Sequence, residues 1–447
     1  MKVGIVGGGL TGLALAYYLS LEGVQATVFE EKSRSGGLLD AVEVDGAWID
    51  RYYHCILSGD ADLLALIDTL GLRDRVRFGE TRQGFYSHRV IYAATSARDF
   101  LLFPPLTVVE RFRLGLSMLL ALRGKDWQEL DGISVEDWLV GLGGRGTFEK
   151  LWKPLLRVKF DGDFQRLPAT YIWARLQRMS TTRSSAGQKE RTGYLVGSFK
   201  LLVDRLVERI EQMGSTLQVG RRVEQVVIAD ERVAGVRIAG EEIGLDSVIV
   251  TTPSTGLRAL VPEPYRERLE LPSDHAHLGV ICALLLLDRG ITPYYTLNVA
   301  DERIPFTGVI ETTNLISPDA VGGHHLVYLP KYLLPDSAYW QQSDMDLRVQ
   351  YLGWLKEMFP TFREDWVDRL FVFRDPFVEP LNLIGRSHSS MPVATALPGL
   401  YLVNSSQIYP DLSNCQATVR HVVRAVPELL SGLFSDPSAR LRSSVVM

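Results

Sequence analysis

The chain has 447 residues but only three cysteines, Cys55, Cys282 and Cys415, and these lie far apart. No pair of them forms a C-x-x-C arrangement, which excludes a disulfide-reductase motif and a zinc-finger spacing. Such sparse cysteine is typical of a reducing compartment, so the sequence predicts a cytoplasmic protein.

Long hydrophobic runs and a strong charge of one sign are also absent. No stretch reaches the roughly twenty uninterrupted apolar residues of a membrane-spanning helix. The first residues enter a predicted strand at once, so no signal peptide is expected. The net charge of −5 argues against general nucleic-acid binding. The adjacent His324 and His325 would point to opposite faces of a strand and cannot chelate one metal ion together, so no metal site is predicted.

The first thirty residues hold the pattern that organises the rest. An apolar run over 2–6 is followed by the turn Gly7-Gly8-Gly9-Leu10-Thr11-Gly12, an apolar helical stretch, a second apolar run over 24–29 and then Glu30. This order of strand, glycine turn, helix, strand and acid is typical of a βαβ unit that binds a dinucleotide. The alternative is a glycine-rich turn that binds no ligand.

Each position in this pattern has a physical reason. Gly7 permits a sharp turn, Gly9 lets the backbone approach a pyrophosphate, and Gly12 lets the helix lie close to the sheet. The helix N-terminus presents free N–H groups to the phosphates. Glu30 is placed to accept hydrogen bonds from a ribose 2′-OH, which favours FAD or NAD over NADP.

The stretch after Glu30 carries a resemblance to a known family. It continues through Gly36-Gly37-Leu38 to Gly46-Ala47-Trp48-Ile49-Asp50 and Tyr52-Tyr53-His54. This arrangement resembles the flavin-containing amine oxidase superfamily, which includes protoporphyrinogen oxidases and phytoene desaturases. The resemblance implies bound FAD, with Glu30 on the adenosine ribose and Gly37-Leu38 along the pyrophosphate and ribityl chain. The chain departs from many amine oxidases at Leu38, where they carry arginine, and at Tyr52, where they carry a small residue.

The C-terminal part is more similar to UDP-galactopyranose mutases, which share the fold. A strand predicted over 397–404 ends at Asn404, and a helix is predicted from about Asn414 to Val426, where Pro427 would interrupt it. By the resemblance, the strand end contacts the ribityl chain and the helix N-terminus faces the flavin. Cys415 is interpreted as a small packing residue, the alternative being a thiol whose pKa the helix N-terminus lowers.

The resemblance thus gives a set of candidate FAD-binding residues, among which Val223 would offer its backbone to the adenine. The set is Gly7, Gly9, Leu10, Thr11, Gly12, Glu30, Glu31, Arg34, Gly37, Leu38, Val223, Asn404, Ser413, Asn414, Cys415 and Gln416.

A second dinucleotide fingerprint is missing. The apolar run over 246–253 lacks a G-x-G-x-x-G turn, although enzymes that reduce FAD with NAD(P)H through a dedicated domain usually carry one about there. This absence argues for a flavin that takes electrons directly from the substrate.

The middle of the chain is less specific. A helix over 107–122 carries apolar residues flanked by arginines, and we interpret it as a core helix of a substrate domain. The alternative is a peripheral membrane contact through residues 104–123, as in membrane-attached members of the superfamily. Lys159 resembles the lysine near the flavin of amine oxidases, but the spacing does not match, so we expect a solvated structural lysine.

The predicted fold class is α/β, with a Rossmann-type FAD-binding domain and an interleaved substrate domain of mixed β-sheet and helices. The FAD-binding domain would comprise 1–58, 215–275 and 391–435. The substrate domain would comprise a mostly helical 59–214 and a sheet over 276–390, leaving 436–447 as a flexible tail.

These features predict an FAD-dependent oxidoreductase that removes a hydride from an organic substrate at the flavin N5. Tyr53, His54 and Arg374 are the candidates for the catalytic cleft, and Arg374 could instead form a buried ion pair with Asp375 or another acid. The alternative function is a redox-neutral mutase of a nucleotide sugar. Others are a desaturase or oxidase of a lipid-linked or polycyclic substrate at a membrane surface, and a non-enzymatic flavoprotein. The partner is a small molecule, lipid-linked or nucleotide-linked in two of these cases.

Overall fold

The computed structural model describes residues 1–124, 126–180, 191–269, 277–386 and 391–435. Its first layer is a five-stranded sheet in which every neighbouring pair is parallel. The strand order is β10 (Thr216–Gln218), β2 (Ala26–Phe29), β1 (Val3–Val6), β14 (Ser247–Val250) and β20 (Leu400–Leu402). The four apolar runs predicted at the two ends of the chain and over 246–253 therefore lie side by side.

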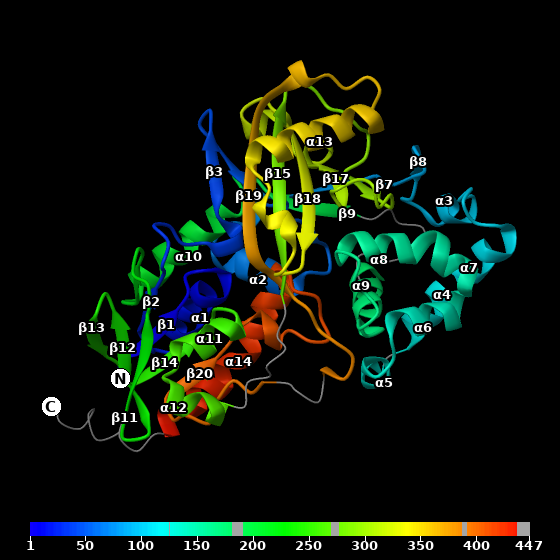
Figure 1. Cartoon of the computed structure of the whole chain (residues 1–447). Coiled ribbons are helices and arrows are strands. Elements are labelled where there is room, and N and C mark those ends of the chain that lie inside the picture. Colours follow the sequence, from blue (N-terminus) through cyan, green and yellow to red (C-terminus); the bar gives the residue numbers. More distant parts are fainter. Residues whose placement is uncertain (125, 181–190, 270–276, 387–390, 436–447) are drawn as a thin grey trace.

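Helices cover one face of this sheet (Figure 1). They share one hydrophobic core and are α1 (Leu10–Leu21), α2 (Ala61–Thr69), α10 (Lys200–Gln212) and α14 (Cys415–Ser435). The other face packs against a small sheet of β11 (Gln225–Ala229), β12 (Arg232–Ile238) and β13 (Glu241–Gly244). Thus α2 and α10, which the predicted division assigns to the substrate domain, pack on the parallel sheet.

The prediction that Pro427 interrupts the last helix is wrong. The helix α14 continues through Pro427 to Ser435. A proline inside a helix removes one backbone hydrogen bond and costs about 3 kcal/mol. Leu429 and Leu433 follow it on the buried face, with 0% and 1% of their surface exposed, and their burial offsets that cost.

A second, seven-stranded sheet rises from the first (Figure 1). Its order is β19 (Val367–Pro380), β15 (His277–Leu287), β18 (His325–Leu333), β17 (Gly308–Glu311), β16 (Thr296–Val299), β7 (Gln83–Ser87) and β8 (Val90–Ala93). Every residue of β15 is buried. Alternate residues face two different cores, Ile281 and Leu285 toward α13 (Asp344–Met358), Cys282 and Leu284 away from it. A continuous apolar run is thus explained by burial on both faces.

Helices from the first half of the chain form a third layer, drawn mainly in cyan and green in Figure 1. They are α3 (Ala97–Leu101), α4 (Val108–Arg123), α5 (Trp127–Asp131), α6 (Val135–Gly143), α7 (Arg145–Thr147), the π-helical turn η3 (Phe148–Trp152), α8 (Lys153–Lys159) and α9 (Thr170–Ser180). None of the described helices combines the length and the apolar character needed to cross a membrane.

The interpretation of the 107–122 segment as a core helix is wrong. Only Leu114, Ser117 and Ala121 of α4 are buried, whereas Val108 and Phe112 have 77% and 71% of their surface exposed. The helix begins at Val108, next to the predicted start, and Thr107 caps it. Buried residues at a spacing of three and four form a narrow stripe, so most of the apolar side chains fall outside it.

The remaining elements connect these layers. The strands are β3 (Ala41–Val44) with β4 (Ala47–Asp50), and β5 (Ile56–Leu57), β9 (Arg191–Leu195) and β6 (Val76–Glu80) in a three-stranded sheet. The helices are α11 (Ser254–Leu260) and α12 (Glu263–Arg266), with 3-10 turns η1 (Gly37–Leu39), η2 (Arg73–Arg75), η4 (Glu267–Leu269), η5 (Thr312–Asn314), η6 (Pro318–Val321), η7 (Ala338–Gln341), η8 (Glu364–Trp366) and η10 (Ser405–Gln407). The predicted tail 436–447 lies outside the described residues.

Asp60 ties the helical layer to the parallel-sheet core, because its side chain, 3% exposed, meets Arg178 of α9 at 2.9 Å. The same carboxylate accepts the Leu57 N–H at 2.8 Å. We expect Asp60→Ala to lower the free energy of unfolding by about 2–3 kcal/mol, since it leaves a buried N–H without an acceptor. Urea denaturation measures this. Asp204→Ala, which breaks an exposed pair with Lys200, should cost less than about 1 kcal/mol, and equal losses would contradict the assignment.

Candidate functional site

The N-terminal glycine turn lies at the carboxyl end of β1, and its glycines are required for different reasons. Gly7 has φ +110, a conformation that side chains rarely adopt. A Cβ on Gly12 would lie 1.9 Å from the Gly7 carbonyl oxygen, so α1 can approach the strand only without it. Both glycines are therefore required by the backbone conformation and packing of the protein, whether or not a ligand binds.

Gly9 is different, because nothing in the protein requires a glycine there. Its φ is −78, and a Cβ built on it would meet only the Gly37 Cα, at an ordinary 3.9 Å. The space before it is open, at the N-terminus of α1, where Leu10 and Thr11 begin the helix. A Cβ would fill a cradle suited to a pyrophosphate, so these residues fit the predicted cofactor.

The second glycine turn closes this cradle. The Gly36 N–H donates a hydrogen bond to the Gly8 carbonyl at 2.8 Å, and Gly9 and Gly36 form an isolated bridge. Gly37 has φ +59 and starts the turn η1, which contains Leu38. The two turns that the resemblance assigns to one cofactor are thus in backbone contact.

The acidic end of β2 lies beside them. Glu30 is buried, and its carboxylate accepts the N–H groups of Gly8 and Lys32, each at 2.8 Å. The carboxylate thereby fixes the glycine turn from the side where a ribose would lie. Glu31 is exposed and 3.9 Å from Arg222.

The other two candidates on this side make protein contacts. Arg34 binds Asp40 at 3.1 Å and the Ala41 carbonyl at 3.2 Å. Val223 is buried in the core between the parallel sheet and β11–β13, next to the exit of β2.

The C-terminal candidates reach the same region from β20. Asn404 is buried, and its amide donates to the Thr252 carbonyl at 2.8 Å, which ties the ends of β14 and β20 together. Asn414 accepts the Ala417 N–H at 3.0 Å and so caps α14. The Gln416 side chain accepts the Leu63 N–H at 2.8 Å and thereby fixes α14 to α2.

Cys415 is the first residue of α14, and burial raises the pKa of its thiol to about 12. The alternative of a lowered pKa is therefore wrong, since burial in apolar surroundings opposes the thiolate. Its electrostatic neighbours include Cys55, which follows His54 in the chain. His54 in turn lies 3.1 Å from the Leu38 carbonyl, so the helix N-terminus and the glycine turns converge on one region.

Two of the three catalytic candidates lie together. The Nε2 of His54 donates to the Leu38 carbonyl, and its ring packs on Phe199. The Tyr53 hydroxyl lies 3.1 Å from that of Tyr332. Burial lowers the pKa of His54 to about 4, against the effect of its hydrogen bond, so the ring is neutral at neutral pH.

Arg374, the third catalytic candidate, lies apart from Tyr53 and His54. Its guanidinium binds Asp344 at 2.6 Å and the Gln342 carbonyl at 2.8 Å, at the start of α13. On β19 its even-numbered neighbours Leu370 and Val372 pack toward α13, whereas the odd-numbered side chains pack on the opposite core. The expectation that Arg374 lines the cleft fails because of this alternation. The ion-pair alternative holds with Asp344 as the acid, but the pair is exposed rather than buried, because 65% of the Asp344 side chain is exposed.

Lys159 is not solvated, contrary to the sequence-based expectation. Its Nζ lies 2.8 Å from the Glu379 carboxylate and 3.2 Å from the centre of the Tyr332 ring, and 22% of the side chain is exposed. Burial alone lowers the pKa of Lys159, but Glu379 outweighs it and raises the pKa overall. Sequence reasoning missed this pair, because α8 and β19 are far apart in the chain and neither residue stands in a motif.

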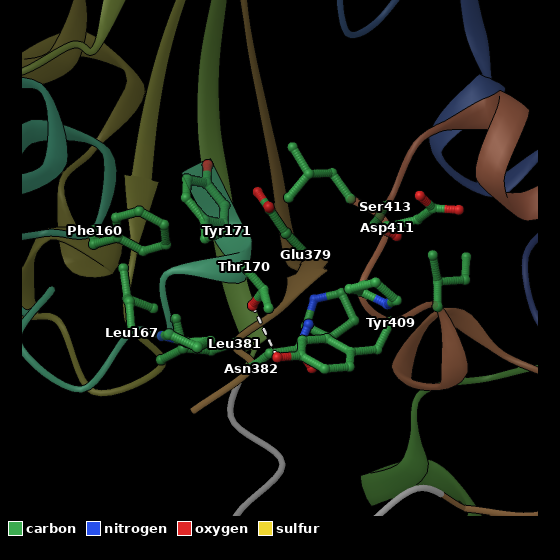
Figure 2. Close-up of a pocket in the computed structure, with 15 residues that line it drawn as sticks. Phe160, Leu167, Thr170, Tyr171, Glu379, Leu381, Asn382, Tyr409, Asp411 and Ser413 are labelled. Atoms are coloured by element: carbon green, nitrogen blue, oxygen red, sulfur yellow. Dashed lines mark hydrogen bonds between the residues drawn. The ribbon is translucent and has the colours of Figure 1, made fainter. Parts of the chain in front are cut away.

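Glu379 faces a pocket between the helical layer and the loop before α14 (Figure 2). Ser413, a cofactor candidate, lines the same pocket, as do Tyr171 and Tyr409. The Tyr409 hydroxyl is engaged with Thr170 at 2.8 Å and with Asp131. The pocket thus reaches from the helical layer to the chain segment that enters the α14 N-terminus.

The chain resembles known proteins over most of its length. Residues 10–409 match the model of a family described as flavin containing amine oxidoreductase. The chain is 25% identical over 306 residues to the 15-cis-phytoene desaturase of Synechococcus elongatus, a match that covers 60% of this chain and 62% of that protein. It is 39% identical over 77 residues to the mitochondrial protoporphyrinogen oxidase of Nicotiana tabacum, 17% of this chain and 15% of that one.

Solved structures share the fold. The crystal structure of reduced UDP-galactopyranose mutase superposes with a TM-score of 0.71 over 96% of this chain and 95% of that one, at 15% identity. At this identity the likeness concerns the fold alone. The desaturase match spans about three-fifths of that protein's length.

Asp50 and His54 both line a second pocket. We expect their contributions to the free energy of unfolding to change with pH in opposite directions. Burial raises the pKa of Asp50 to about 7, although the Phe199 N–H opposes this. From about pH 4 to 7 the folded state holds a proton that the unfolded chain releases, so the Asp50 contribution to stability falls as pH rises. For His54, whose pKa is lowered from 6.5 to about 4, the unfolded chain holds the proton and the contribution rises with pH.

The free energy of unfolding of Asp50→Asn relative to the unsubstituted protein should therefore increase with pH in this window, by at most about 1.4 kcal/mol per pH unit. That of His54→Asn should decrease. Urea denaturation at intervals of half a pH unit gives both slopes, and two variants that run parallel to the parent would contradict these assignments.

Proposed function

The chain belongs to the flavin containing amine oxidoreductase family, and from this premise we propose that it is an FAD-dependent oxidoreductase that removes a hydride from a small organic substrate. The family match confirms the resemblance that the glycine turns predicted, and with it FAD as the cofactor. The predicted α/β class is confirmed as well.

The observation that carries the proposal is the cradle between Gly9 and Gly37. It lies at the carboxyl ends of the parallel strands, where open α/β sheets bind ligands. The N-terminus of α1 supplies N–H groups for a pyrophosphate, and Glu30 flanks the place of the ribose. The candidate residues from Gly7 to Gln416 are proposed to hold FAD in this way.

Bound FAD would supply the two-electron acceptor for a substrate C–H or N–H bond. The protein's own residues supply position. His54 fixes the Leu38 carbonyl, and Tyr53 is fixed by Tyr332, so the loop between β4 and β5 is held against both the glycine turn and the seven-stranded sheet. The lack of a second dinucleotide fingerprint supports electron transfer directly from the substrate.

The substrate is proposed to be a small molecule that enters the pocket beside Ser413. The relatives with similar sequences are, by name, enzymes of phytoene and protoporphyrinogen, both of them small molecules. Most of the pocket lining is apolar or aromatic, which suits a substrate of that kind.

The exposed face of α4 supports a peripheral membrane contact through residues 104–123. Its exposed apolar side chains continue those at the end of α3, and Arg98, Arg113 and Arg123 are exposed nearby. The exposed apolar set is Leu101, Leu102, Val108, Val109, Phe112, Leu116, Leu119 and Leu120. Apolar residues rimmed by arginines suit the surface of an anionic bilayer.

The cofactor proposal is tested by Gly9→Val and Gly12→Val. The purified protein should be yellow, with the two visible absorption bands of oxidised flavin. Gly9→Val should lose at least about nine-tenths of its bound FAD at unchanged apoprotein melting temperature, because its side chain enters only the cradle. Gly12→Val should fail to fold, because its Cβ meets backbone. A Gly9→Val protein as yellow as its parent would refute the cradle.

The membrane proposal is tested by sedimentation with vesicles of phosphatidylcholine and phosphatidylglycerol. The double variant Phe112→Ser/Leu116→Ser should bind at least about tenfold more weakly, because each buried apolar side chain contributes about 1.5–3 kcal/mol. Met345→Ser/Val349→Ser on α13 is the control, since 68% and 67% of the surface of these residues is exposed, against 71% for Phe112 and 45% for Leu116. Unsubstituted protein that stays in the supernatant would exclude the contact.

A further inference from the structure

Glu379 is distinctive among the polar groups of the Ser413 pocket (Figure 2). In the described part of the chain the lining contains no lysine, arginine or histidine. Its other carboxylate, Asp411, is paired with Arg420 at 3.3 Å. The Tyr409 hydroxyl is already shared between Thr170 and Asp131. Glu379 is paired as well, with Lys159 at its Oε2, but with 15% of its side chain exposed it is the more buried of the two carboxylates, against 46% for Asp411.

Lys159 holds the Glu379 carboxylate from outside the pocket lining. Lys159 binds its Oε2 at 2.8 Å but does not line the pocket. The ammonium group packs on the Tyr332 ring, whose hydroxyl meets that of Tyr53. The positive charge is thus covered by Glu379 itself and by Tyr332, and a molecule in the pocket meets the carboxylate first.

Apolar side chains form much of the remaining wall. Phe160 and Leu167 are 1% and 2% exposed, and Leu381 lies beside them. A carboxylate only accepts hydrogen bonds, and in such surroundings donors stabilise it; Lys159 supplies one at Oε2, and a bound molecule can supply another. An anion in this pocket would face two carboxylates, and none of the described residues that line it is cationic.

This inference rests on the proposed function. We propose that Glu379 selects the substrate, so that the pocket takes an apolar or aromatic molecule that offers an N–H or O–H donor to this carboxylate and excludes anions. Lys159 holds the carboxylate in place from behind the wall.

The experiment uses three planar probes of one shape, titrated by calorimetry into the FAD-loaded protein. Benzamidinium is a cation with N–H donors, benzamide is a neutral donor, and benzoate is an anion without donors. Benzamidinium and benzamide should bind, with benzoate at least about tenfold weaker than benzamidinium. Glu379→Gln should weaken benzamidinium at least about tenfold and reduce its preference over benzoate, because a hydrogen bond to a charged acceptor is lost. Asp411→Asn, in the same pocket, should change either affinity less than about twofold.

Equal binding of benzamidinium by Glu379→Gln and its parent would overturn the proposal, as would equal losses in Glu379→Gln and Asp411→Asn. If Glu379→Gln does not fold, the unsubstituted protein still tests the proposal. Benzoate that binds it as tightly as benzamidinium does would overturn the proposed role of Glu379. The flavin absorbance of the same samples distinguishes a failure of the Glu379 proposal from a failure of the proposed function. Yellow protein with the wrong probe order refutes only the role of Glu379, whereas colourless protein that takes up no FAD overturns the proposed function and the substrate assignment with it.

Discussion

The contact between two glycine turns is the constraint on which the rest of the structure depends. The Gly36 N–H reaches the Gly8 carbonyl at 2.8 Å, and a Cβ on Gly37 would lie 3.3 Å from the Gly9 Cα. The φ of Gly37 is +59, a conformation that favours glycine, and a Cβ there would be crowded, so this approach depends on glycine at position 37. The contact fixes the first strand, the acid after the second strand and the turn η1 as one unit. The α14 N-terminus lies near this unit, since Cys415 interacts with Cys55, the residue after His54.

A chain of contacts leads from this unit to the substrate side. His54 binds the Leu38 carbonyl, its neighbour Tyr53 meets Tyr332, and Tyr332 carries the ammonium of Lys159, which holds Glu379. Each step is a polar contact in a largely buried place, where a missing partner is costly. The position of the pocket carboxylate is therefore tied to the position of the loop between β4 and β5, which holds Tyr53 and His54.

The sequence allowed the parts with a local period or a local motif to be predicted, and these included both glycine turns and four of the five strands of the parallel sheet. It did not allow pairings between distant elements to be predicted. The face on which Arg374 lies follows from the register of β19 against β15, which no local pattern encodes. The partner of Lys159 depends in the same way on how α8 meets the end of β19.

Two helices show why an apolar pattern does not by itself predict burial. In α14 the apolar face meets α1 and α2, and this packing carries the helix past a proline that would end it in isolation. In α4 a comparable content of leucine and valine meets only a narrow strip of protein. The difference lies in what the rest of the fold places opposite each helix. An apolar face that the fold leaves uncovered, with arginines beside it, is better explained by a surface outside the chain than by the chain's own core.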